Sequence, residues 1–148
     1  MDKNQTLEAI EMAKKSHENA MAKIEMAING DKVDSPTPAA KSLCKFGKWL
    51  YNEENHLEEI LGELFYTKLE RSHAQWHDEY LRIYNIFFKE KKGGFLSGIL
   101  GGGHKVDPLE LDKAKLYYLE LEETTKDLLH ILGSCERRVT AMSEAKFH

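Results

Sequence analysis

The sequence predicts an all-α protein, a four-helix bundle with a short second helix. Apolar residues recur three or four positions apart along most of the chain, which places them on one face of each helix. No stretch of β-branched residues alternates with polar ones, so no strand is expected. The length of 148 residues, of which 41% are hydrophobic, suits a chain that buries one core. We therefore expect residues 1–148 to form a single domain.

The first helix is expected to end at Asn29 and Gly30, which suit a C-cap and a turn. Its predicted inner face consists of Leu7, Ile10, Ala13, His17, Met21, Ile24 and Ile28. Polar residues 32–37 are expected to form a loop. Proline suits the first turn of a helix, so the second helix is predicted over about residues 38–51.

The third helix is expected from residue 54 or 55 to about residue 90. Its predicted inner face consists of Leu61, Phe65, Leu69, His73, Trp76 or His77, Tyr80, Ile83 and Phe87. Residues 93–103 (GGFLSGILGGG) are rich in glycine and should form a loop whose apolar side chains pack against the end of the bundle. The alternative is a tip that docks a partner or touches a membrane.

Asp107 and Pro108 are predicted to be the N-cap and the first residue of the fourth helix. Apolar residues then alternate at spacings of three and four over more than four heptads, which is typical of a coiled-coil seam. The predicted seam consists of Leu111, Ala114, Tyr118, Leu121, Thr125, Leu128, Leu132, Cys135, Val139 and Met142. This long seam leads to the hypothesis that the chain forms a homodimer.

Composition excludes several functional classes. The formal net charge of −4 and the absence of a Lys/Arg stripe argue against a nucleic-acid partner. No apolar run approaches the roughly 18 residues that span a bilayer, and the start of the chain does not resemble a signal peptide. The two cysteines form no disulfide framework, so a reducing, cytoplasmic location is expected.

Seven histidines in such a chain are unusual, and three of them, His17, His73 and His77, fall on predicted inner faces. Each could be an ordinary core residue, but His73 and His77 are four apart and share one side of a helix. Together with the thiolate of Cys44, three imidazoles would complete the tetrahedron that Zn²⁺ prefers. Such a closed site leaves no position for a catalytic water, which argues against an enzyme. A carboxylate nearby would suit it, and the candidates are Glu18, Asp78 and Glu79.

The remaining histidines are expected to be solvated, namely His56, His104, His130 and His148, and Cys135 should act as a small buried apolar residue. A hemerythrin-like di-iron bundle is an alternative, but Met21 and Ile60 stand where carboxylates would follow His17 and His56. A phosphotransfer bundle and a metal-free structural bundle are further alternatives. The candidates for phosphotransfer are His56 and His130, but neither lies in the His-x-x-Lys-Gly context that such domains favour.

The stretch CKFGKW, residues 44–49, resembles the central motif of the chemoreceptor zinc-binding (CZB) domain, Cys-x-apolar-Gly-x-aromatic. The family places a His 20 to 30 residues before this motif and His-x-x-x-His a similar distance after it. Here His17 precedes Cys44 by 27 residues, and His73 follows Cys44 by 29. The resemblance covers about residues 6–88. It implies a zinc site formed by His17, Cys44, His73 and His77.

The motif also has a physical interpretation. Gly47 shares the face of Cys44 and would let another helix approach closely, while Phe46 and Trp49 would shield a metal from water; Gly47 and Trp49 could instead be simple packing residues. Two features depart from the family. Ala20 stands where a large residue, often Trp, is usual, so the cover over His17 is expected to be thin, and the segment 93–103 is longer than the usual connection.

The resemblance further implies a biological role. Family members are cytosolic, tend to dimerise, and are mostly attached to chemoreceptor signalling regions or diguanylate cyclase domains. They are implicated in sensing zinc or oxidants such as hypochlorous acid through the cysteine. No signalling hairpin or cyclase motif is found in this sequence, so a free-standing module that acts in trans or as a dimer is expected.

Overall fold

The computed structural model describes residues 1–89 and 106–147, and all secondary structure in these two ranges is helical. This confirms the predicted all-α class. The helices are α1 (Lys3–Ile28), α2 (Lys45–Leu50), α3 (Leu57–Leu61), α4 (Glu63–Phe87) and α6 (Pro108–Ala141), with 3₁₀ turns at Glu53–Asn55 and Glu144–Lys146. The prediction for residues 93–103 lies outside the described residues. Within the described parts, no helix is both long enough and apolar enough to cross a membrane.

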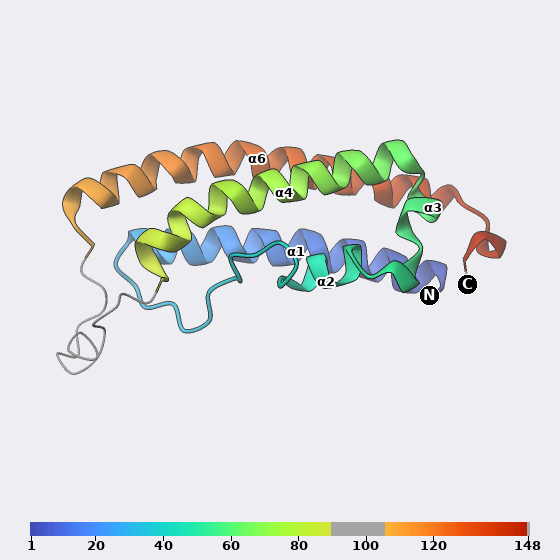
Figure 1. Ribbon diagram of the computed structural model, residues 1–148, viewed down its shortest axis with the longest axis horizontal. Coiled ribbons are helices and arrows are strands. Elements are labelled where there is room, and N and C mark those ends of the chain that lie inside the picture. The colour runs from blue at the N-terminus through green and yellow to red at the C-terminus, as the bar shows by residue number, and fades with distance from the viewer. Residues whose placement is uncertain (90–105, 148) are drawn as a thin grey trace.

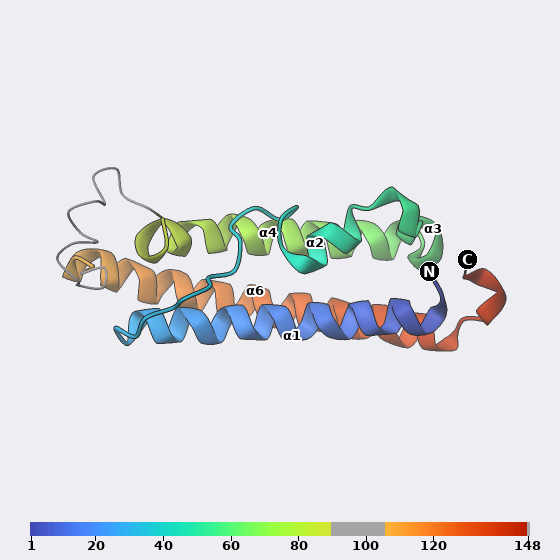
Figure 2. The ribbon, with the colours of Figure 1, turned by 90° about the horizontal axis from the view of Figure 1, so that it is seen from below.

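Three long helices, α1, α4 and α6, form the body of the bundle (Figure 1). α1 and α4 run in the same direction and α6 returns antiparallel to both, so the two termini lie at the same end (Figure 1). The chain between α1 and α4 takes the fourth position: α2 packs on α1 (Figure 1), and in the view from below it lies in front of α4 (Figure 2). α6 packs against both α1 and α4. The four-helix bundle is therefore realised with one position that is only partly helical.

The second helix is much shorter than predicted. Helix α2 covers only Lys45–Leu50, and Cys44 lies outside the helix as its N-cap. The preceding backbone is held by α4 instead: the Tyr80 hydroxyl donates to the carbonyl of Thr37 at 2.7 Å, and His77 Nδ1 donates to that of Ala39 at 2.9 Å. Carbonyl groups that point at α4 cannot also point along the axis of a helix from residue 38. The predicted start of the second helix was wrong because side chains distant in sequence bind the carbonyl groups of this backbone.

The third helix is divided, whereas one continuous helix was predicted. Gly62 separates α3 from α4 and has a φ of +86°, a backbone conformation that side chains disfavour. Beyond it, α4 has the predicted inner face, with Leu69, His73, Trp76, His77, Tyr80 and Ile83 all buried. The break lets the chain turn into α4 with that face directed at the core.

The fourth helix is present as predicted, and the Asp107 carboxylate caps it by accepting from the Leu109 amide at 2.8 Å. Most of its seam is buried within the chain, namely Ala114, Leu121, Thr125, Leu128, Leu132, Cys135 and Val139. Since these side chains pack toward α1 and α4 of the same molecule, they are not available to a dimer interface. The seam therefore does not support the dimer hypothesis that was based on it.

A buried hydrogen bond joins α4 to α6: the indole Nε1 of Trp76 donates to the Thr125 hydroxyl at 2.8 Å. Thr125→Val would leave the indole nitrogen without an acceptor, so we expect a loss of about 1–3 kcal/mol in the free energy of unfolding, measured with urea. Thr140→Val is the control, because Thr140 is exposed on the same helix and its hydroxyl donates to the Glu136 carbonyl of that helix. Equal losses in the two variants would contradict the assigned role of this bond.

Candidate metal centre

Four side chains that are far apart in the sequence converge inside the bundle: His17 from α1, Cys44 from the N-cap of α2, and His73 and His77 from α4. One potential ligand atom from each lies within 4.8 Å of the other three. All four side chains are buried, with exposed fractions of 5% or less. Three nitrogen donors and one sulfur donor at such separations can hold a single tetrahedral metal ion.

Backbone carbonyl groups orient two of the imidazoles. His17 Nδ1 lies 2.7 Å from the carbonyl oxygen of Ala13, and His77 Nδ1 lies 2.9 Å from that of Ala39. Because a carbonyl only accepts, each Nδ1 carries the proton and each Nε2 keeps its lone pair. Metal-binding histidines are usually held by such an acceptor.

The carboxylates that the sequence offered for this orienting role do not fill it. Glu18 and Asp78 are exposed, and the two oxygens of Glu79 lie 2.9 and 2.5 Å from the hydroxyl of Thr124 on α6. Backbone groups took their place because Ala13 lies one helical turn before His17, and because the Ala39 carbonyl faces α4. Sequence patterns identify side chains and do not reveal where a carbonyl outside a helix will point.

Two nitrogen atoms of the cluster are buried without any hydrogen-bond partner, His73 Nδ1 and His77 Nε2. Buried polar atoms are nearly always paired, and leaving one unpaired costs about 1–3 kcal/mol. The other nitrogen of His73, Nε2, does have a neighbour in the cluster: it lies 3.3 Å from the sulfur of Cys44. A metal ion bound among these atoms would supply the partner that His77 Nε2 lacks, so the donor set fits a metal.

Burial keeps the three imidazoles uncharged, which is the form that binds metals. Burial lowers the pKa of His17 to about 4 and the pKa of His73 to about 2, and it also lowers the pKa of His77. Near neutral pH all three rings are therefore uncharged and have lone pairs to donate. No proton has to leave them before a cation binds.

Cys44 behaves differently, because burial raises the pKa of its thiol. The backbone amide of Gly47 donates to its sulfur at 3.2 Å and acts in the opposite direction. A metal cation would shift the balance to the thiolate, which is the form that coordinates. Cys44 is thus the one member of the cluster that must lose a proton to act as a ligand.

Gly47 has a different role from the one predicted. A Cβ atom at this position would lie 1.6 Å from the carbonyl oxygen of Lys41 and 3.3 Å from the sulfur of Cys44. The close neighbour is therefore the turn that leads into α2, and not another helix. The absence of a side chain lets this turn fold back so that the Gly47 amide reaches the sulfur.

Phe46 is fully buried, and its ring lies 4.8 Å from that of His73, centroid to centroid. Trp49 is only half-buried and lies beyond Phe46, at 5.7 Å. The expected thin cover over His17 is not found. The fully buried Trp76 lies edge-on to His17 at 4.7 Å and provides the cover that Ala20 cannot. The sequence placed Trp76 on the inner face of its helix, but it did not indicate that this residue packs across onto α1.

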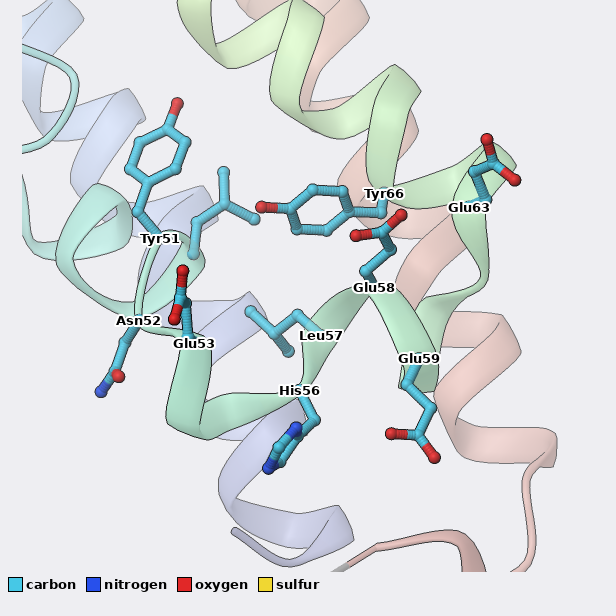
Figure 3. Close-up of a pocket in the computed structure, with 10 residues that line it drawn as sticks. Tyr51, Asn52, Glu53, His56, Leu57, Glu58, Glu59, Glu63 and Tyr66 are labelled. Carbon is cyan, nitrogen blue, oxygen red and sulfur yellow. The ribbon is translucent and has the colours of Figure 1, made fainter.

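The other histidines that the structure describes, His56 and His130, are exposed as predicted, and Cys135 is buried in the apolar core. His104 and His148 lie outside the described residues. A pocket at the junction of α2, α3 and α4 has an acidic rim that includes Glu53, Glu58, Glu59 and Glu63 (Figure 3). None of the four clustered residues lines it. The pocket is thus a separate surface feature that adjoins Tyr51.

Comparison with protein-family models matches residues 17–84 to the chemoreceptor zinc-binding domain (CZB). The match begins at His17 and includes Cys44, His73 and His77, the four residues that the fold brings together. Comparison with curated proteins and with solved structures found no significant match. A buried His–Cys–His–His cluster suited to a metal ion, in a sequence that matches this family model, makes zinc the cofactor. Residues 17–84 of this chain are thus similar to the chemoreceptor zinc-binding domain family, and they include all four clustered residues.

Proposed function

We propose that the chain binds one Zn²⁺ ion through His17, Cys44, His73 and His77, and acts as a cytoplasmic sensory or regulatory module of bacterial signal transduction. The observation that carries this proposal is the convergence of these four buried donors within 4.8 Å. With residues 1–148 as a single domain, the module regulates a partner and is not itself an enzyme. Four protein ligands complete a tetrahedron, which supports this role because no position is left for substrate or a catalytic water.

The donor set favours zinc over the di-iron alternative. Di-iron sites in helical bundles are built from bridging carboxylates, whereas the cluster contains three imidazoles and one thiol. Nitrogen and soft sulfur donors in a tetrahedral arrangement are typical of zinc. Two acidic side chains on α4 are half-buried, and both have other partners: Glu79 is engaged with Thr124 on α6, and Glu70 with Lys41.

The signal is zinc availability or the oxidation state of Cys44. His17, His73 and His77 lie on long helices that the core holds in place, but Cys44 lies on the short segment before α2. Loss of Cys44 as a ligand would therefore free α2 more readily than any other part of the site. Release of this helix from α1 is the conformational change that a partner would read.

The partner is a second copy of this chain, or a chemoreceptor or diguanylate cyclase bound in trans. The predicted α6 seam is used within the chain, so a dimer would need another surface. Three large apolar side chains on the first part of α6 are more than half exposed, namely Leu109, Leu116 and Leu119. They support α6 as the helix that meets the partner, in chemotaxis or in cyclic-di-GMP signalling.

Zinc content measured after purification without added zinc tests the metal site. We expect one zinc ion per wild-type chain and a clear loss of zinc in Cys44→Ala, because three imidazoles alone leave the tetrahedron open. Cys135→Ala is the matched control, since Cys135 is equally buried but lies outside the cluster, and it should retain the metal. Far less than one equivalent in the wild type, unchanged in His73→Ala, would reject the proposal.

A further inference from the structure

One face of α4 contacts the chain segment that carries Cys44, residues 37–51, at four successive points. The residues that make these contacts are three or four positions apart and therefore form a single row, namely Glu70, His73, His77 and Tyr80. The two central members belong to the metal cluster. The two outer members hold the same segment by contacts in which the cluster takes no part.

Glu70 makes two of these outer contacts through one carboxylate oxygen. It lies 2.8 Å from the ammonium group of Lys41 and accepts a hydrogen bond of 3.1 Å from the Tyr51 hydroxyl. The ammonium group of Lys41 also lies over the Tyr51 ring, 5.3 Å from its centroid. Glu70, Lys41 and Tyr51 thus form a closed triangle, which we call the Glu70 clasp.

The Glu70 clasp contacts the segment on both sides of Cys44. Lys41 precedes Cys44 by three residues, and Tyr51 is the C-cap of α2, directly after the helix that Cys44 begins. The Lys41 carbonyl oxygen lies 3.4 Å from the Cys44 sulfur and packs against Gly47. The position of Lys41 is therefore transmitted to Cys44 through a single tight turn.

We propose that Glu70 is a positioning residue for Cys44: the Glu70 clasp holds the segment on α4 independently of any metal bond and so sets how readily Cys44 leaves its place in the site. This inference rests on the proposed zinc site. Within that site, ligand strength and clasp strength together determine when the segment opens. Loss of the Glu70 carboxylate would thus change how readily the module responds to its signal, without changing the set of metal donors.

Partial exposure makes such control feasible. The Lys41 and Glu70 side chains are 44% and 26% exposed, so water can replace these contacts while the core stays packed. The segment can then open locally, without global unfolding. The rate at which a reagent reaches Cys44 follows the population of this open state.

The test compares Glu70→Ala with Glu136→Ala. Glu136 pairs with Lys14 at the same distance of 2.8 Å, between α6 and α1, and does not contact the segment. Two rates are measured in the zinc-loaded full chain: zinc transfer to an excess of a coloured chelator, and alkylation of Cys44 by iodoacetamide, quantified by peptide mass spectrometry. We expect Glu70→Ala to increase both rates roughly tenfold, the size expected for hydrogen bonds to a charged group, and Glu136→Ala to change neither.

Global unfolding in urea is followed in parallel, and similar small losses are expected for both variants. Equal rates in the two variants would overturn the inference. If Glu70→Ala folds poorly, Lys41→Met replaces it and should also accelerate both reactions, while Lys41→Arg, which keeps the ion pair, should restore the wild-type rates. An unchanged Lys41→Met protein would likewise overturn it.

Failure of the zinc site would be recognised separately. Wild-type chain that takes up no zinc refutes the proposed function, and the alkylation of Cys44 in that metal-free chain then still reports on the clasp. Cys135 lies fully inside the core and provides an internal reference in the same digest. Its alkylation should stay slow in every variant.

Discussion

Removal of zinc from the purified protein is expected to lower its free energy of unfolding by about 4 kcal/mol, the value for free zinc at a thousandfold excess over its dissociation constant. The physical reason lies in the cluster. Three uncharged imidazoles and one thiol are buried there, and His73 Nδ1 and His77 Nε2 have no hydrogen-bond partner. The metal would supply the partner that His77 Nε2 lacks and so remove a cost that otherwise destabilises the fold.

Urea unfolding followed by circular dichroism, with zinc and with a chelator, measures this effect. His77→Ala should unfold at nearly the same urea concentration under both conditions, because it lacks one ligand. His130→Ala should still respond like the wild type, since His130 is exposed on α6 and away from the cluster. A wild-type midpoint that does not move on chelation would show that the ion contributes nothing to the folded state.

Gly47→Ala is expected to destabilise the protein by about 3 kcal/mol and to weaken zinc binding, since over-packing of this kind typically costs 1–3 kcal/mol. The added Cβ would lie 1.6 Å from the Lys41 carbonyl oxygen and 2.8 Å from its carbonyl carbon. Both are backbone atoms, so the turn before Cys44 has to move. Movement of this turn displaces the sulfur from the histidines.

The matched control is Gly133→Ala. Gly133 lies inside α6, and a Cβ there would meet only the flexible end of Arg137, at 3.5 Å. Alanine is the better helix former by up to about 1 kcal/mol, so this variant should be as stable as the wild type or slightly more stable. Thermal unfolding and zinc content measured on both variants separate the steric effect from any general effect of replacing glycine. Equal behaviour of the two would contradict the role assigned to Gly47.

Two wrong predictions, the start of the second helix and the cover over His17, share one cause. The second helix was predicted to begin at residue 38, but side chains of α4 hold the carbonyl groups of Thr37 and Ala39. The cover over His17 was predicted to be thin at Ala20, but Trp76 reaches it from α4. In both cases a residue distant in sequence overrode what the local pattern indicated, and local spacing contains no information about such partners.

By itself, the sequence determined the helical class, the inner faces of α1, α4 and α6, and the set of candidate donors, since periodicity and residue chemistry are local properties. Only the tertiary structure decided how the donors are held. It placed the Ala13 and Ala39 carbonyl groups on the imidazoles, made Cys44 an N-cap, and turned the long α6 seam inward. These features depend on which backbone and side-chain groups meet across the bundle, and that is fixed when the helices pack to bury their apolar faces.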